Sequence, residues 1–133
     1  MIIVAPLNFA LVKDGIYRSG YPNKKNLEFL TRLKLQSILY LSDDDVDQDY
    51  KNMFSDKKLY HVRMQAAKEP LELSQELMTV ALKIVLDVRN HPILLHCNKG
   101  SLPFIIIGKH RIGVLVACIR KLENWSLSSI LNN

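Results

Sequence analysis

Apolar residues along the chain follow two periods, one typical of strands and one typical of helices. Short apolar runs and alternations bounded by turn-forming residues indicate strands, because each run is too short for a helix. They predict strands near residues 16–18, after a turn at Asp14 and Gly15, and at 37–41, 59–64 and 93–95. Pro92 precedes the last of these, at a position where no ladder hydrogen bond is lost.

Helical spacing of apolar residues occurs in three longer segments. Residues 26–33 and 112–122 show it, and residues 74–89 are the clearest case, with Ser74 as N-cap and Arg89 near the carboxyl end. The apolar face of the first segment consists of Leu27, Leu30 and Leu33. The predicted apolar face of the clearest helix consists of Leu77, Ala81, Ile84, Val85 and Val88.

The order of these elements predicts the fold class. A strand, a helix and a second strand joined by short connections argue for a parallel βαβ unit. The 133 residues are enough for one domain with its own core. We therefore predict a single α/β domain with a mainly parallel central sheet flanked by helices.

Composition limits only slightly the classes of binding partner and the cellular compartments that are expected. The net charge of +5 favours polyanions, among them phosphorylated small molecules, nucleic acid and anionic lipid, without choosing among them. Two cysteines, Cys97 and Cys118, do not suit a disulfide framework and favour a reducing compartment. The apolar start lacks a basic leader, and no apolar run is long enough to span a membrane. We expect a cytoplasmic protein, with the nucleus as the alternative.

The acidic run at residues 43–49 invites a calcium-binding interpretation, because alternate aspartates open such loops. That pattern also needs a glycine where Gln48 stands and a glutamate where Phe54 stands, so it fails. The better interpretation is a solvated helix start, with carboxylates near the positive end of the helix. No metal site is predicted.

Most of the reactive groups lie at residues 96–111, between a predicted strand and the helix that follows it. A helix amino end presents unpaired N–H groups and partial positive charge, which bind phosphate and favour a thiolate. A cysteine held there, Cys97, can have its pKa lowered from ~8.5 to about 3.5–7.5. Arg111 can clamp two phosphate oxygens with its planar guanidinium. The loop thus carries the groups of a nucleophilic phosphate-binding site, or P-loop.

Residues 96–100 read HCNKG and residues 109–113 read KHRIG. Joined directly, they resemble the His-Cys-x5-Arg signature of cysteine phosphatases. The chain is most similar in pattern to the plant and fungal atypical dual-specificity phosphatases, a family that includes inositol pyrophosphate phosphatases. The similarity covers nearly the whole chain, through further stretches at 6–9, 16–20, 68–70 and 86–92 and through the downstream sequences IRKL and NWSL.

The resemblance implies a cysteine-phosphatase-like three-layer domain over residues 1–133 and a metal-free mechanism without a cofactor. Cys97 would be the nucleophile that forms a phosphocysteine, and Arg111 would hold the phosphate. Glu69 is the candidate acid, and a polar surface turn explains it equally well. The implied substrate-binding residues are His96, Asn98, Lys99, Gly100, Lys109, His110, Gly113, Arg18 and Lys68. Several of them have structural alternatives. His96 can orient the loop from the core, Arg18 can be a solvated strand-end residue, and Lys68 can belong to a polar surface turn. Surface solvation explains Lys99, Lys109 and His110 individually.

The implied substrate is an inositol pyrophosphate, with phosphotyrosine or other phosphoesters as alternatives. The partner is then a phosphorylated small molecule or a phosphoprotein, and no nucleic acid is expected. Cleaving an alkyl phosphate gains about 10²–10⁴ from protonation of the leaving group. Cleaving a diphosphate expels phosphate, a far weaker base, so a site without a well-placed acid suits pyrophosphate bonds.

The chain departs from the family pattern at Ala66 and Ala67, just before the matching stretch at 68–70, and at three further places. The octapeptide SLPFIIIG at residues 101–108 places thirteen residues between Cys97 and Arg111, where the signature has five. Ile112 stands where the family usually has a hydroxyl residue, and the family normally continues past Asn133, so we expect its C-terminal segment to be missing.

Three interpretations of the insert stay open. The octapeptide bulges out with Gly100 and Gly108 closing its neck, or it marks a chain that lost the phosphate cradle, or it is a short in-frame intron retained in the reading frame. The second interpretation carries an alternative function, a catalytically inactive phosphate-binding or scaffold protein.

Overall fold

The structure, a computed structural model, describes residues 2–63, 75–97, 115–117 and 119–121. Within these residues a five-stranded sheet has the order β1-β2-β5-β3-β4. The strands are β1 (Ala10–Lys13), β2 (Ile16–Ser19), β3 (Ser37–Leu41), β4 (Lys58–Val62) and β5 (Ile93–Cys97). Among these five described strands, β1 and β2 pair antiparallel, whereas β2, β5, β3 and β4 run parallel to one another. The predicted α/β fold with a mainly parallel sheet is confirmed.

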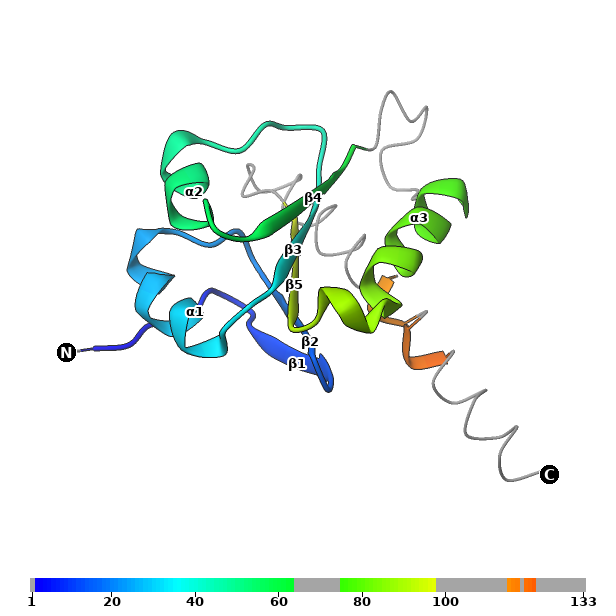
Figure 1. The fold of residues 1–133 in the computed structure, drawn as a ribbon, viewed down its shortest axis with the longest axis horizontal. Coiled ribbons are helices and arrows are strands. Elements are labelled where there is room, and N and C mark those ends of the chain that lie inside the picture. The colour runs from blue at the N-terminus through cyan, green and yellow to red at the C-terminus, as the bar shows by residue number, and fades with distance from the viewer. Residues whose placement is uncertain (1, 64–74, 98–114, 118, 122–133) are drawn as a thin grey trace.

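Helices cover both faces of this sheet and make a three-layer domain (Figure 1). On one side lie α1 (Leu27–Leu33), which follows the 3-10 turn η1 (Lys24–Asn26), and α2 (Gln48–Met53). On the other side lie α3 (Gln75–Leu86) and the helical residues 115–117 and 119–121. The predicted parallel βαβ unit is present as β2, α1 and β3, with β5 inserted between its two strands.

Alternation along the strands sends their side chains into two separate apolar clusters. One cluster, on the α3 side, contains Leu39, Leu41, Leu95 and Cys97 together with the helical residue Leu115. The other, on the α1 and α2 side, is built from Leu30, Leu35, Ile38, Tyr50, Phe54 and Leu94. Every residue of β3 and β5 is buried, as expected for central parallel strands covered on both faces.

The predicted helix over residues 74–89 is wrong at its carboxyl end, because α3 stops at Leu86. The Asp87 side chain accepts a hydrogen bond from the Arg89 backbone N–H and starts a separate 3-10 turn, η2 (Val88–Asn90). The buried side chain of Asn90 then donates to the Ile84 carbonyl near the helix end.

Two apolar residues assigned to helix faces are instead exposed. Val88 lies in η2 and is 75% exposed, so it does not extend the apolar face of α3. Leu27, the first residue of α1, is 43% exposed, while Leu30 on the same helix is buried. The proposed N-cap Ser74 lies outside the described residues.

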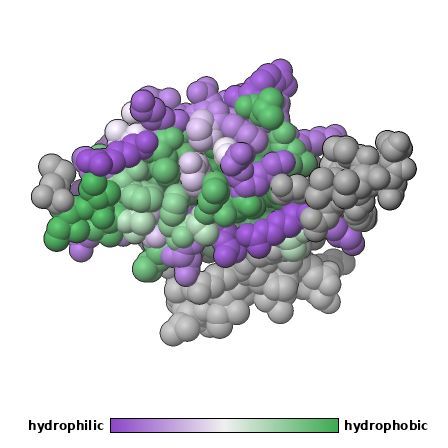
Figure 2. Space-filling view, turned by 90° about the horizontal axis from the view of Figure 1, so that it is seen from below, coloured by the Kyte–Doolittle hydropathy of each residue, from purple (hydrophilic) through white to green (hydrophobic). Residues whose placement is uncertain are grey.

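The N-terminal segment lies on the body with its apolar side chains largely exposed. Ile2, Ile3, Val4 and Leu7 are exposed, and Figure 2 shows a hydrophobic area at the end of the molecule where the chain begins. Polar contacts hold this segment, since Gly20 N–H donates to the Leu7 carbonyl at 2.7 Å and the Asn26 amide donates to the Val4 carbonyl. None of the helices in the described ranges has both the length and the apolar character that a membrane crossing requires.

Candidate active site

The carboxyl ends of three parallel strands meet at one edge of the sheet. Cys97 ends β5 and is the register partner of Leu41, the last residue of β3. On the other side of β5, His96 is the register partner of Ser19, the last residue of β2. Ligands of open α/β sheets bind beyond the carboxyl ends of the strands. The predicted nucleophile therefore lies at the edge where such sites form.

The Cys97 thiol is buried, with 6% of the residue exposed. It shares the α3-side cluster with Leu41, Leu95 and Leu115. The β5 strand that carries it is held on both sides by parallel ladders to β2 and β3. The sulfur is thus positioned by the most regular part of the sheet.

His96, on the opposite face of β5, is fully buried and both of its ring nitrogens are engaged. Its Nε2 lies 2.5 Å from the hydroxyl oxygen of Tyr50, and its Nδ1 lies 3.0 Å from the carbonyl oxygen of Cys97. Burial lowers the pKa of His96 to about 4, so the ring is neutral at physiological pH. This geometry favours the interpretation in which His96 orients the loop from the core.

An aromatic cluster surrounds this histidine on the α2 side of the sheet. We define it as Tyr21, Tyr40, Tyr50, His61 and His96. The Tyr40 ring stacks on His96 with centroids 4.9 Å apart and contacts His61 at 4.8 Å. Burial raises the pKa of Tyr40 to about 12 and raises that of Tyr50 further. Both phenols therefore keep their protons throughout the working pH range.

Arg18 lies on β2 next to the nucleophile strand. It is the register partner of Leu95, two residues before Cys97, so the Arg18 and Cys97 side chains leave the sheet on the same face. The residue is partly buried, and its buried Nε has no hydrogen-bond acceptor within the described part of the chain. A buried guanidinium N–H in this state is available to an anion that enters the site.

The acidic run has structural roles in the described residues. Asp47 caps α2, because its side chain accepts from the Tyr50 backbone N–H at 2.8 Å. Asp45 pairs with Arg63, which holds the pKa of the Asp45 carboxyl below its usual range. The prediction of a helix start with acids at its positive end is confirmed.

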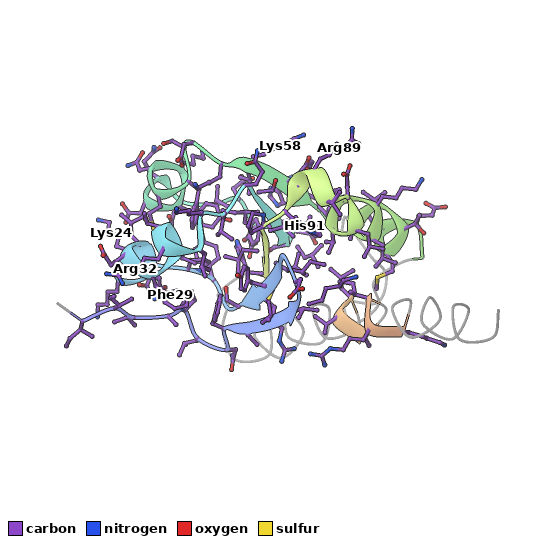
Figure 3. All side chains as sticks on the ribbon, turned by 60° about the horizontal axis from the view of Figure 1, so that its bottom comes forward. Lys24, Phe29, Arg32, Lys58, Arg89 and His91 are labelled. Carbon is purple, nitrogen blue, oxygen red and sulfur yellow. The ribbon has the colours of Figure 1, made fainter. Side chains whose placement is uncertain are left out.

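Four of the other surface cations with described contacts, Lys24, Arg32, Lys58 and Arg89, do not lie together. Lys24 and Arg32 lie at the α1 end of the molecule, and Lys58 and Arg89 lie apart from them along the upper edge of the view (Figure 3). Three of them pair with an acidic side chain, and Lys58 lies over an aromatic ring. These four cations therefore do not form one basic patch.

The structure brings together three predicted site residues, Cys97, His96 and Arg18, around β5. The other predicted site residues lie outside the described residues and stay predictions: Lys68, Glu69, Asn98, Lys99, Gly100, Lys109, His110, Arg111 and Gly113. Sequence reasoning missed Tyr50, which contacts His96 from α2. Tyr50 lies three residues after Asp47, the N-cap of α2. Nothing in the sequence indicated that Tyr50 would contact His96.

Comparison with known proteins agrees with this arrangement. The sequence profile of the tyrosine phosphatase family matches residues 3–133. The chain is 40% identical to inositol diphosphatase DSP3 of Arabidopsis thaliana over 133 residues, which is 98% of this chain and 62% of that protein. It is 45% identical to inositol diphosphatase SIW14 of Saccharomyces cerevisiae over 134 residues, 98% of this chain and 45% of that protein. The chain thus spans under two thirds of these relatives.

A solved structure shows the same fold. The core catalytic domain of the PP-IP phosphatase SIW14 from S. cerevisiae, in complex with citrate, matches with a TM-score of 0.79 and 42% identity. The match covers 98% of this chain and 75% of that one. The names of these relatives give no support to the alternative of an inactive scaffold.

Proposed function

The chain belongs to the tyrosine phosphatase family, and on that premise we propose that it is a cysteine-based phosphatase acting on inositol pyrophosphates. The family and its inositol diphosphatase relatives support the reaction class and the substrate. The position of Cys97 at the carboxyl end of β5 is the single observation in the structure that carries the proposal. A reducing compartment, cytoplasmic or nuclear, suits a thiol nucleophile.

In the proposed reaction the Cys97 thiolate attacks the terminal phosphorus of a diphosphate group. The S–P bond forms as the bridging P–O bond breaks, and the inositol phosphate leaves with the electron pair of that bond. Arg111 and the loop amides hold the charge that develops on the phosphoryl oxygens. Water then hydrolyses the S–P bond, which releases inorganic phosphate and regenerates the thiol.

The leaving group makes a strong acid unnecessary in this reaction. An inositol phosphate is a much weaker base than an alkoxide, so its departure gains less from protonation. Glu69 is retained as the candidate acid for phosphoester substrates. We expect its removal to matter more for those than for a pyrophosphate.

Arg18 is proposed to bind a phosphate oxygen beside the nucleophile. Its place on the Cys97 face of the sheet supports this role over that of a solvated strand-end residue, as does its buried Nε, which has no acceptor among the described residues. An Arg18→Lys variant keeps the charge but loses the planar fork. We expect it to lower kcat/KM by roughly 10-fold, the value of one charge-assisted hydrogen bond.

The test of the proposed function is a substrate panel. Phosphate release is measured from a pyrophosphorylated inositol, from phosphotyrosine and from an alkyl phosphoester. We expect the pyrophosphate to give the highest kcat/KM. Phosphotyrosine as the best substrate would overturn the substrate assignment, and turnover of none of the three would overturn the enzymatic proposal for this chain.

The insert at residues 101–108 needs a deletion variant for comparison. A version of the chain without these eight residues restores the His-Cys-x5-Arg spacing. Activity in both versions means that the insert bulges out harmlessly. Activity only in the shortened version assigns the loss to the insert.

A further inference from the structure

A pocket lies between the turn η1 and the helix α2, and we call it the η1–α2 pocket. Its walls come from Leu7, from residues 21–25 and from α2 with its N-cap Asp47. The cavity volume is about 440 Å³, which falls in the range of small-molecule sites. Neither Cys97 nor Arg18 lines this pocket, so it is not part of the phosphatase site proposed above.

The inner walls of the pocket are apolar and largely aromatic. Tyr50 and Pro22 are buried, with the Tyr21 and Tyr50 rings 5.2 Å apart. Tyr21 and Met53 are partly buried and pack against the apolar cluster on the α1 and α2 side. Aromatic rings and a thioether make favourable contacts with a flat aromatic ligand. These four side chains carry no charge, so they suit an aromatic ring better than an inositol polyphosphate.

The walls are held in place by contacts of the protein itself. Lys24 Nζ lies 3.3 Å from a carboxylate oxygen of Asp49, and this ion pair joins η1 to α2. The Asp47 N–H donates to the Tyr21 hydroxyl oxygen at 3.4 Å, which ties the start of α2 to the stretch after β2. A preorganised pocket of this kind loses little conformational entropy when a ligand binds.

The charged groups around the pocket leave a positive charge on one side. Asp49 is neutralised by Lys24, and the Asp47 carboxylate caps α2, where the helix dipole offsets its charge. Lys25 is exposed and has no ion pair among the residues that the structure describes. The Asn23 side-chain oxygen accepts from the Lys25 N–H at 2.9 Å, so the amide offers its donors to a ligand. Lys25 and Asn23 together suit an anionic group.

We propose that the η1–α2 pocket binds a small aromatic anion. The ring of the ligand packs against Tyr21 and Met53, and its carboxylate, sulfonate or phosphate group binds Lys25 and Asn23. The inference goes beyond the proposed phosphatase activity, because it involves neither the Cys97 thiol nor the predicted phosphate loop.

The first experiment uses the fluorescent dye 8-anilinonaphthalene-1-sulfonate as the probe. Its uncharged analogue, 1-anilinonaphthalene, has the same rings without the sulfonate. We expect the dye to bind at a single saturable site and to bind more tightly than the analogue. Fluorescence that rises without saturation, or equal affinity for the two compounds, would overturn the proposal.

Lys25→Gln removes the positive charge without changing the apolar walls. The side chain is exposed, so the variant should fold like the unmodified chain. We expect the dissociation constant for the dye to rise by roughly 2- to 5-fold, the effect of one exposed ion pair, and that for the uncharged analogue to stay the same. Lys51→Gln is the matched control, because Lys51 is also exposed but does not line the pocket. An equal loss in both variants would mean that the dye responds only to net charge, and would contradict the site.

Nuclear magnetic resonance locates the bound dye. We expect nuclear Overhauser contacts between its ring protons and the methyl group of Met53. Contacts with Ile2 and Ile3 alone would place the dye on the exposed apolar N-terminal segment and would overturn the site.

The preference for an aromatic ligand is tested by competition. We expect 2-naphthoate to displace the dye at a lower concentration than octanoate, an aliphatic anion with the same carboxylate. Octanoate that displaces the dye equally well or better would contradict the aromatic class.

Two controls separate this pocket from the proposed phosphatase site. Inorganic phosphate should not displace the dye, and the Cys97→Ser variant should bind the dye like the unmodified chain. Displacement by phosphate would place the dye in the phosphatase site and would overturn the inference. None of these measurements depends on turnover, so a failure of the proposed function would leave their results unchanged.

Discussion

Gly15 lies directly against the imidazole of His91, which is two residues before β5. A Cβ built on Gly15 would stand 2.7 Å from His91 Nδ1, and the glycine has φ of +83°. Its carbonyl accepts from the Ile93 N–H at 2.8 Å, the first hydrogen bond between the hairpin and β5. This turn therefore fixes the register of β5 relative to β2. The register in turn determines how far along the sheet edge Cys97 lies.

Gly15→Ala should destabilise the fold. The added methyl group meets the His91 ring, and alanine is strained at this positive φ, so we expect a loss of about 1–3 kcal/mol in the free energy of unfolding. Gly20→Ala is the control, because its Cβ would meet the Leu7 carbonyl oxygen at 3.3 Å and its φ is not positive. Urea unfolding of both variants measures the difference, and a smaller loss for Gly15→Ala than for Gly20→Ala would contradict the account.

His96 should make stability depend on pH. Burial lowers its pKa in the folded state to about 4, below the ordinary value of 6.5, so the unfolded chain binds the proton more readily. The stability that depends on keeping His96 neutral is fully present above pH 6.5 and is lost as the pH falls toward 4. It amounts to about 3 kcal/mol over that window.

The measurement compares thermal unfolding of the chain and of a His96→Asn variant between pH 7.5 and 4. We expect the melting temperature of the chain to fall more steeply than that of the variant. Parallel curves would mean that other groups, with the carboxylates first among them, account for the acid sensitivity.

Asp47→Ala should weaken α2 because it removes the side chain that accepts from the Tyr50 N–H. The expected loss is about 1 kcal/mol of unfolding free energy, typical of an N-cap. Asp49→Ala is the comparison, since Asp49 lies in the same turn and forms an exposed ion pair with Lys24, worth about 0–1 kcal/mol. Equal losses in the two variants, read from denaturant midpoints, would argue against the cap.

Hydrophobic pattern predicted most of the fold because the central strands are buried on both faces. The runs that became β3 and β5 are continuous and apolar, and turn residues bound them. The strand β1 was missed, since its half-exposed residues show no clear alternation. The end of α3 was misplaced because Val88 continues the helical spacing of apolar residues. In the structure, the side chains of Asp87 and Asn90 form hydrogen bonds with nearby backbone groups and end the helix earlier.

The site was predictable to the extent that its chemistry is local in sequence. His96 and Cys97 are adjacent and directly follow the predicted strand at 93–95, so their place at the sheet edge followed from the pattern, although the structure includes both residues in β5. Tyr50 lies 46 positions from His96, and only the packing of α2 against the sheet brings them together. The Arg18 position relative to Cys97 likewise depended on β5 lying between β2 and β3, an order that sequence periodicity does not specify.

The central claim is that the thiol at the end of β5 performs the chemistry. The most direct test is phosphate release from a pyrophosphorylated inositol by the chain and by its Cys97→Ser variant, prepared and assayed side by side. The account predicts turnover by the chain and none above background by the variant, although the two fold equally well. Equal rates for the two proteins would contradict it.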